Sequence, residues 1–503
     1  MPERIAAYLS NLTPVADHRP WPRYEVDADT WSAIGAALGE GGGDLLALWG
    51  ERTRVHLALR SGGTPSVVSL AVRDGGFPSI GRHHAPAIRL ERAIADLFGH
   101  TPVGAPDRRP WLDHGAWGIR APLGDAAPRA RRDPADYDFL PVRGEGLHEI
   151  PVGPVHAGVI EPGHFRFTAN GETVVRLEER LGYVHKGIDG LLTDAELARA
   201  QKIAARVSGD STVASSFAFA RAVEAALGFE PPPRARLLRG VMAELERIAN
   251  HLGDIGAICN DAAFALIHAY TGILRERVLA ACDAAFGHRL MMDRIVPGGV
   301  AQDLAPDGVN AILTTLTRLR PRFDDIVRAY DDTPSLQDRT CLTGIVREDL
   351  VAGWGAGGYV GRASGRAFDA RRDLPYPPYD DAPLDVPVRH DGDVNARVWI
   401  RIREVECSIR LVQHWLTSLP AGPTLAALPA ARTPREGMAV VEAFRGDLLV
   451  WLRMAGGKIL RCHVRDASWF QWPLLEAAIE GNIVADFPLC NKSFNCSYSG
   501  HDV

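Results

Sequence analysis

The sequence Gly-Pro-Val-His-Ala-Gly-Val-Ile-Glu-Pro-Gly-His-Phe-Arg-Phe occupies residues 153–167, and Arg-Leu-Glu-Glu-Arg-Leu-Gly-Tyr-Val-His-Lys-Gly-Ile occupies residues 176–188. Between them lies Asn170-Gly171, the dipeptide most typical of a two-residue hairpin turn. The apolar and polar alternation around this turn predicts two paired strands, over residues 155–169 and 173–181. We expect this hairpin to open the larger part of the chain.

Long amphipathic helices are predicted after the hairpin. Apolar residues recur every three or four positions from Leu237 to Ile255, which is the spacing of one helix face. A β pattern returns over 438–465 and precedes a short helix over 474–480 and an irregular tail. The other predicted elements of this part are helices over 261–287, 307–329 and 393–418, and a glycine-rich loop over 353–365.

A smaller α+β unit precedes the hairpin. Residues 121–149 are rich in Pro, Arg, Asp and Gly without periodicity, which is typical of a linker. The predicted fold class is therefore α+β, with a small N-terminal α+β domain over 1–120, the linker, and a large mostly helical domain with peripheral β-strands over 150–503. The N-terminal unit is expected to contain helices over 29–39 and 85–98 and strands over 45–49, 55–59 and 66–72.

Composition excludes several classes of protein. The net charge of −6 over 503 residues, with no basic stripe, argues against nucleic-acid binding. No stretch approaches the roughly 18 apolar residues of a membrane-spanning helix, and the N-terminus does not resemble a signal peptide, so we expect a cytoplasmic protein. The 7 cysteines form no Cys-x-x-Cys pair, which argues against a zinc or iron–sulfur site within this chain.

The hairpin segments closely resemble two homologous families, the D subunit of respiratory complex I and the large subunit of membrane-bound, energy-converting NiFe hydrogenases. The loop Gly-Tyr-Val-Gly-Arg-Ala-Ser-Gly at 358–365 and Glu442 with Arg445-Gly446 extend the resemblance over roughly 150–503. The segment Glu-Arg-Ala-Ile-Ala-Asp-Leu-Phe-Gly at 91–99 resembles the C subunit of complex I. The resemblance implies a chain that fuses C-like and D-like units, as in formate-hydrogenlyase-type hydrogenases, with a hydrogenase-large-subunit-like helical domain.

The metal-binding cysteines of the hydrogenases are missing. In those enzymes two Cys-x-x-Cys pairs hold nickel and iron, and the first pair falls here on Ser208 and Ser211. The second pair falls on Ser497 and Gly500, or on Cys496 and Ser499 if the register slips by one residue. Because hydroxyl oxygens are hard ligands and nickel prefers soft thiolates, we expect the chain to bind no metal.

The quinone contacts of complex I are not carried over either. The quinone-binding histidine of that family falls on Ile160, and the tyrosine falls near Gly209. His156 matches an earlier histidine of the hairpin motif, and His164 could reach the same cavity. For both histidines the alternative is a structural role in which the imidazole ties a loop to the backbone. The resemblance therefore does not by itself imply a quinone site, and quinone remains one candidate ligand.

The resemblance leaves a polar cavity where the two former metal-binding segments meet. Asp210 and Lys492 are expected to form a buried charge pair there, able to relay protons or to bind a small polar or quinone-like ligand. The alternative is a relic that has only a structural role. The candidate catalytic residues are Asp210, Lys492, His156 and Arg206, and the candidate ligand-binding residues are Ser208, Ser211, His164, Asn495 and Ser499.

These expectations favour a core subunit of a complex-I-like, membrane-associated oxidoreductase. Electrons would come from formate, ferredoxin or a nicotinamide cofactor (NAD) through iron–sulfur clusters in partner subunits. The implied partners are a small iron–sulfur protein like the B subunit of complex I, a ferredoxin-like protein and antiporter-like membrane proteins on the inner face of the cell membrane. Two alternatives are an active NiFe hydrogenase with atypical ligands and a non-catalytic structural adaptor.

Overall fold

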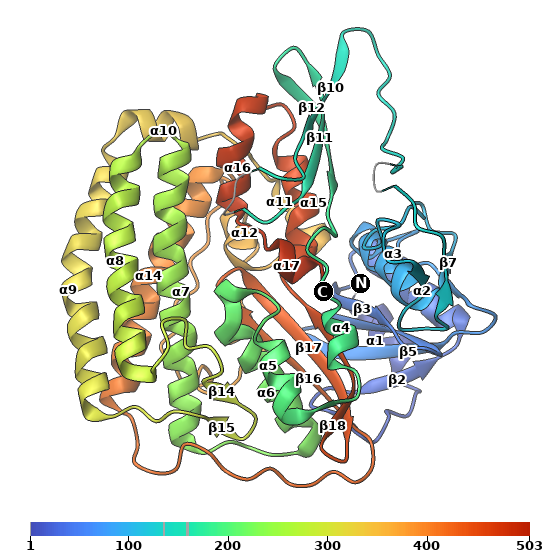
Figure 1. Cartoon of the computed structure of the whole chain (residues 1–503), viewed down its shortest axis with the longest axis horizontal. Helices are drawn as coiled ribbons and strands as arrows, with labels where there is room; N and C mark the ends of the chain where they lie inside the picture. The colour runs from blue at the N-terminus through green and yellow to red at the C-terminus, as the bar shows by residue number, and fades with distance from the viewer. Residues whose placement is uncertain (1, 134–135, 157–159) are drawn as a thin grey trace.

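The computed structural model describes residues 2–133, 136–156 and 160–503, and it confirms the α+β class (Figure 1). A small α+β unit and a large helical part lie side by side, and a three-stranded sheet formed by residues 147–180 projects from between them. Within the described ranges, no helix combines the length and the apolar character that crossing a bilayer requires.

The N-terminal unit is built on a four-stranded sheet with the order β2-β5-β4-β3, in which β2 and β5 run parallel and the other pairs antiparallel. Helix α2 begins after Asp27, whose carboxylate accepts a hydrogen bond from the Thr30 amide at 2.8 Å. Trp31 of α2 and Leu90 of α3 are buried in the core. The elements are α1 Pro2–Leu9, β1 His18–Arg19, β2 Arg23–Val26, α2 Ala28–Gly39, β3 Asp44–Gly50, β4 Arg54–Ser61, β5 Thr64–Ala71, β6 Gly76–Pro78, α3 Ile88–Phe98 and β7 Thr101–Val103.

The predicted hairpin is present with the expected turn but with one shorter strand. Strand β11 starts only at His164, because Pro162 and Gly163 precede it, whereas residues 157–159 lie outside the described part. A third strand, β10, begins inside the predicted linker and pairs antiparallel with β11. The bounds are β8 Ile119–Arg120, β9 Ala127–Pro128, β10 Leu147–Val152, β11 His164–Asn170 and β12 Thr173–Arg180.

The large part is a bundle in which α7 packs against α8 and α14, and α8 packs against α9 (Figure 1). The apolar face predicted from Leu237 to Ile255 lies in the middle of α7 and is buried from Val241 onward, while Leu237 is half-buried. The prediction of a loop over 353–365 was wrong in part, because a short helix starts within it at Gly358. The bounds are α4 Ile188–Leu192, α5 Leu197–Ala204, α6 Thr212–Leu227, α7 Pro233–Asp261, α8 Ala265–Phe286, α9 Pro306–Asp331, α10 Pro334–Thr340, α11 Glu348–Trp354, α12 Gly358–Ala363, α13 Ala370–Asp373 and α14 Val394–Thr417.

A five-stranded sheet with the order β1-β16-β17-β18-β13 joins the two ends of the chain, because β1 adds in parallel to β16. The prediction of an irregular tail at the C-terminus was wrong, because two helices form there. Leu489 and Phe494 lie on the buried, apolar side of the first of them. The bounds are β13 Ala195–Glu196, β14 Ile295–Val296, β15 Gly299–Val300, β16 Arg435–Ala443, β17 Gly446–Ala455, β18 Lys458–Arg465, α15 Ser468–Ala478, α16 Phe487–Phe494 and α17 Tyr498–His501.

The N-terminal sheet packs on this C-terminal sheet. The rings of Trp49 and Trp451 meet there with centroids 5.2 Å apart, and both are buried. Around them, Arg23 bonds Glu436 at 2.8 Å, while the Arg453 guanidinium donates to the carboxylate of Glu51 at 2.9 Å. The two parts of the chain therefore share a core.

Candidate functional site

A cavity of about 600 Å³ lies between the hairpin, the loop before α6, the end of α7 and the two C-terminal helices. One wall is aromatic and comes from Phe165, Phe487 and Tyr498. A second group of lining residues is polar and charged, and one of its members, His156, contacts the ring of Phe165, with centroids 5.4 Å apart. The members of this group are His156, Glu161, Ser208, Asp210, Asp261, Arg445, Asn491, Lys492, Asn495, Ser497 and Ser499.

The two segments that resemble the hydrogenase metal ligands do meet in this cavity. The hydroxyl oxygens of Ser208 and Ser497 are 3.0 Å apart and share a hydrogen bond. The Ser497 hydroxyl also accepts from the Gly500 amide at 2.9 Å, which caps α17. Ser208 donates a second bond to Asp210 at 2.7 Å. Hydroxyl groups therefore contact each other where the resemblance places thiolates.

The charge partner of Asp210 is Arg445, and the predicted direct pair between Asp210 and Lys492 was wrong. Arg445 donates to both carboxylate oxygens of Asp210, at 2.9 and 2.5 Å. Burial raises the pKa of Asp210, but the Arg445 guanidinium outweighs this effect and the pKa falls to about 2. Lys492 contributes only at longer range, because its short helix points it toward Asn495 instead.

Lys492 belongs to a second polar cluster on the same wall. Its ammonium donates to the side-chain oxygen of Asn495 at 3.1 Å and lies 3.7 Å from the carboxylate of Asp254. The amide nitrogen of Asn495 donates to the same carboxylate at 2.9 Å, and Arg401 holds its other oxygen. The Lys492 side chain is about one-third exposed and faces the cavity, while Asn495 and Asp254 hold its ammonium group.

Three of the nine candidate residues do not line the cavity. Arg206 is exposed and forms an ion pair with Asp293, with one bond of 2.8 Å. His164 lies on the other side of the hairpin, where its ring contacts Phe139 and Nδ1 lies 3.4 Å from the Gly153 carbonyl. Ser211 is buried, and its hydroxyl has no hydrogen-bond partner among the described residues.

The other six, His156, Ser208, Asp210, Lys492, Asn495 and Ser499, do line the cavity. The imidazole Nε2 of His156 bonds the Gly163 carbonyl oxygen at 2.7 Å, so this ring also ties the loop together. The amide of Ser499 donates to Glu161 at the rim at 3.1 Å. Sequence reasoning did not assign a role to Arg445, although Arg445-Gly446 was already visible as part of the family pattern.

Two groups hold the 206–211 loop and the start of α6 in place, the exposed Lys186 and the buried Glu246. Lys186 donates to the carbonyl oxygens of Arg206 and Val207, both at 2.9 Å. Glu246 of α7 accepts from the amides of Val213 and Ala214 at 2.7 and 3.1 Å, so it caps the first turn of α6 from a neighbouring helix. The Ser208 hydroxyl therefore has a fixed position before any ligand arrives.

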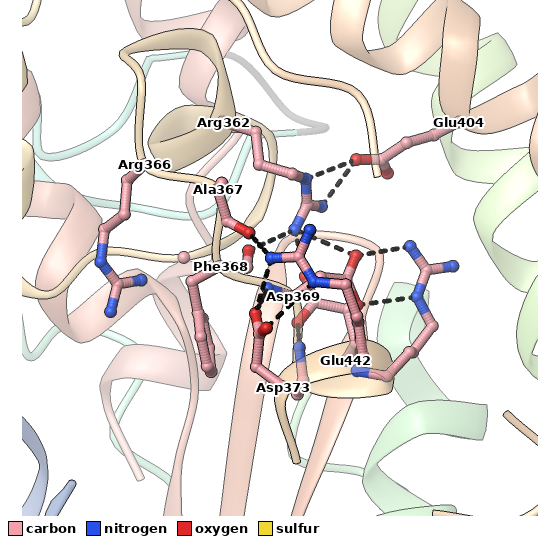
Figure 2. A network of polar contacts seen from close by, with 12 residues as sticks. Arg362, Arg366, Ala367, Phe368, Asp369, Asp373, Glu404 and Glu442 are labelled. Carbon is pink, nitrogen blue, oxygen red and sulfur yellow. Dashed lines mark hydrogen bonds and ion pairs between the residues drawn. The ribbon is translucent and has the colours of Figure 1, made fainter. Parts of the chain in front are cut away.

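A buried charge network supports the strand end that carries Arg445. Figure 2 shows Arg362 between Glu404 and Glu442, with bonds of 2.6 and 2.9 Å. Next to it, Arg247 donates to the backbone carbonyls of residues 442 and 443 at 2.8 and 3.1 Å. A Cβ on Gly358 would overlap the carbonyl oxygen of Arg445, so only glycine lets α12 pack against this turn.

The donor set of the cavity does not fit a nickel–iron centre. Its one sulfur ligand is Cys496, and burial raises the pKa of this thiol well above its usual value, which disfavours the thiolate that binds metals. Within the described part of the chain, no three His, Cys, Asp or Glu side chains are grouped so as to hold a metal ion. The chemistry available here is hydrogen bonding and charge.

Comparison with known proteins agrees with the fold and the cavity described above. Residues 261–438 match the family described as respiratory-chain NADH dehydrogenase, 49 Kd subunit. Over 428 residues, 83% of this chain and 75% of the relative, the chain is 30% identical to formate hydrogenlyase subunit 5 of Escherichia coli (strain K12).

Two further relatives cover both branches. The carbon monoxide-induced hydrogenase of Rhodospirillum rubrum is 31% identical over 69% of this chain and 97% of its own length. The C/D subunit of the NADH-quinone oxidoreductase of Phocaeicola vulgatus is 27% identical over 73% of this chain and 75% of its own length. The chain belongs to the family of complex I D subunits and energy-converting hydrogenase large subunits, as predicted, and is an oxidoreductase subunit of that family.

Proposed function

We propose that this chain is the core subunit of a complex-I-like, energy-converting oxidoreductase in which a polar ligand cavity replaces the nickel–iron centre. The observation that carries the proposal is the 3.0 Å hydrogen bond between the hydroxyls of Ser208 and Ser497. The two hydroxyls bond each other, and Ser208 also bonds Asp210; their oxygens are hard donors that suit nickel poorly.

The ligand that fits the cavity best is a quinone-like electron acceptor. A planar ring would lie against the aromatic wall of Phe165, Phe487 and Tyr498, and its oxygen would face the ammonium of Lys492. The volume of about 600 Å³ is in the range of small-molecule sites. Lys492 would orient and stabilise the reduced oxygen, and the ionised pair of Asp210 and Arg445 would keep the polar wall in place.

The electron supply belongs to other subunits in this proposal. Curated relatives carry names such as formate hydrogenlyase, hydrogenase and NADH-quinone oxidoreductase, so formate, ferredoxin or a nicotinamide cofactor (NAD) are the candidate donors. A small iron–sulfur protein like the B subunit of complex I would dock beside residues 206–215 and 488–500. A ferredoxin-like protein and antiporter-like membrane proteins would complete the complex on the inner face of the cell membrane.

The test begins with nickel and iron analysis of the complex purified natively with its partners. We expect abundant iron from partner clusters and nickel far below one atom per chain. Near-stoichiometric nickel would overturn the proposal in favour of an active hydrogenase with atypical ligands. In the same complex, Lys492→Met should lower quinone-dependent turnover, whereas the control Lys458→Met, on the exposed strand end of β18, should not.

One observation favours a second candidate, a non-catalytic structural adaptor. The charged groups of the cavity already satisfy one another: Asp210 pairs with Arg445, and Lys492 is held by Asn495. Electron transfer through the complex that survives the double change Asp210→Ala and Lys492→Ala would support the adaptor.

A further inference from the structure

A second cavity, of about 190 Å³, lies at the other end of α6 from the candidate site. It is bounded by the second half of α6, the loop after it, the first turns of α7, strand β16 and the chain near β1. Three of its members are arginines, and most of the rest are apolar. The lining is Pro20, Phe217, Arg221, Glu224, Ala225, Phe229, Glu230, Pro231, Arg236, Arg239, Pro377 and Met438.

The guanidinium of Arg221 has no anionic partner in this cavity. One of its terminal nitrogens, Nη1, donates to the Val440 carbonyl oxygen at 2.9 Å, and its Cζ lies 4.2 Å from the ring centroid of Tyr376. Across the described ranges, no carboxylate comes within ion-pair distance of it. A largely buried cation thus relies on one neutral acceptor and one aromatic face.

The neighbouring carboxylates form their direct bonds with other groups, and Glu224 favours the charged form of Arg221 only at longer range. Glu224 receives two bonds from Arg239, at 2.9 and 2.6 Å, and a third from the Gly298 amide at 2.8 Å. Glu230 pairs with Arg236 at 2.8 Å and is mostly exposed.

The one remaining acid, Asp380, is exposed and acts on Arg221 only at a distance. Burial lowers the pKa of Arg221 to about 10, because it outweighs the opposing effects of Tyr376 and Glu224, and Arg239 adds a smaller repulsion. The cavity therefore holds one uncompensated positive charge, on Arg221.

We propose that this cavity binds a small carboxylate with an apolar body, which would pair with Arg221. A desolvated cation is costly unless an anion compensates it, and a guanidinium offers a planar fork that matches a carboxylate. The walls favour an apolar body for the ligand, because Phe217, Phe229 and Met438 offer apolar contacts. The other two arginines of the lining, Arg236 and Arg239, are already paired with carboxylates. A strongly hydrated anion such as inorganic phosphate would leave these walls unused.

The probe for this site is benzoate, and its uncharged analogue benzamide is the control ligand. In calorimetric titration of the full-length chain, we expect benzoate to bind at least about tenfold more tightly than benzamide, because only benzoate forms charge-assisted bonds with Arg221. Arg221→Gln keeps a donor for the Val440 carbonyl but removes the charge, and it should lose this preference. Arg320→Gln, an exposed change on α9, is the matched control and should keep it.

The ligand-free variants provide an independent readout. If Arg221 carries an uncompensated charge, Arg221→Gln should leave the unfolding temperature unchanged or raise it. A clear drop would mean that Arg221 is already paired in the empty protein, and the proposal would fail. It would also fail if benzoate bound no better than benzamide, if Arg221→Gln bound benzoate like the native chain, or if inorganic phosphate bound more tightly than benzoate. Should Arg221→Gln not fold, Arg221→Lys keeps the charge without the fork and should bind benzoate more weakly than the native chain.

Discussion

Replacing Glu404 by Gln tests whether the buried charge network holds the site together. Glu404 lies on α14 and is 1% exposed. One carboxylate oxygen accepts two bonds from Arg362, at 3.1 and 2.6 Å, and the other accepts from the imidazole of His251 at 2.7 Å. Arg247 approaches the second oxygen at 3.4 Å. An amide in this position would turn its NH₂ group toward donors, and only His251, after a change of tautomer, could accept from it.

The expected loss of stability is about 3 kcal/mol, the lower end of the range for removing one partner of a buried ion pair. The lower end applies because Arg362 keeps two other carboxylates, Glu442 at 2.9 Å and Asp369 at 3.2 Å. Arg247 likewise keeps Glu244, at 3.1 Å. The change should also loosen the strand end that carries Arg445, so turnover of the complex should fall with stability.

The pH dependence of this loss has a definite sign. Burial raises the pKa of Glu404, but Arg362, His251 and Arg247 together outweigh it and hold the pKa well below the ordinary 4.5. A carboxylate with a lowered pKa stabilises the fold above the unfolded-state value, and this contribution is lost as the pH falls toward the folded-state value. The difference between native chain and Glu404→Gln should therefore stay constant from about pH 6 to 8 and shrink below about pH 4.5.

The assay is denaturant unfolding of the native chain, Glu404→Gln and a matched control, Glu406→Gln. Glu406 is on the same helix, where it makes a partly exposed pair with Arg403 at 3.0 Å. Such a pair contributes about 0.5 kcal/mol or less. If the midpoints of the two variants coincide, the network does not carry the buried charges that its geometry implies, and the reasoning is wrong.

Three further outcomes are expected. Lys186→Met removes two bonds to the 206–207 carbonyls and should cost about 1.5 kcal/mol in denaturant unfolding, whereas Lys202→Met on the surface of α5 should be neutral; equal effects would contradict the anchoring role. Gly163→Ala would place a Cβ 2.5 Å from the Tyr498 ring and should destabilise by about 1 to 3 kcal/mol, while Gly209→Ala, with open space around it, should be tolerated; a shift in thermal unfolding shared by both would refute this. Nickel added to the full-length chain should leave its thermal transition unmoved, and a saturable shift would count against the loss of the metal site.

Much of the fold was predictable because its signals are local. The Asn170-Gly171 turn, the period of α7 and the short apolar runs of β3 to β5 each depend on residues a few positions apart. The C-terminal helices were missed for the opposite reason. Helix α16 is short and takes its stability from burial of Leu489 and Phe494 against the rest of the molecule, which no local pattern records.

The candidate site was predictable in outline and not in its pairings. The sequence alone predicted that the first cysteine pair of the family falls on Ser208 and Ser211, and the second on Ser497 and Gly500 or, one residue earlier, on Cys496 and Ser499, since this needs only the family pattern. Which charges meet depends on side-chain direction and on segments far apart in the chain. Only the tertiary structure assigned Asp210 to Arg445, 235 positions away, because the tight turn between β16 and β17 aims that guanidinium at the cavity while α16 turns Lys492 toward Asn495.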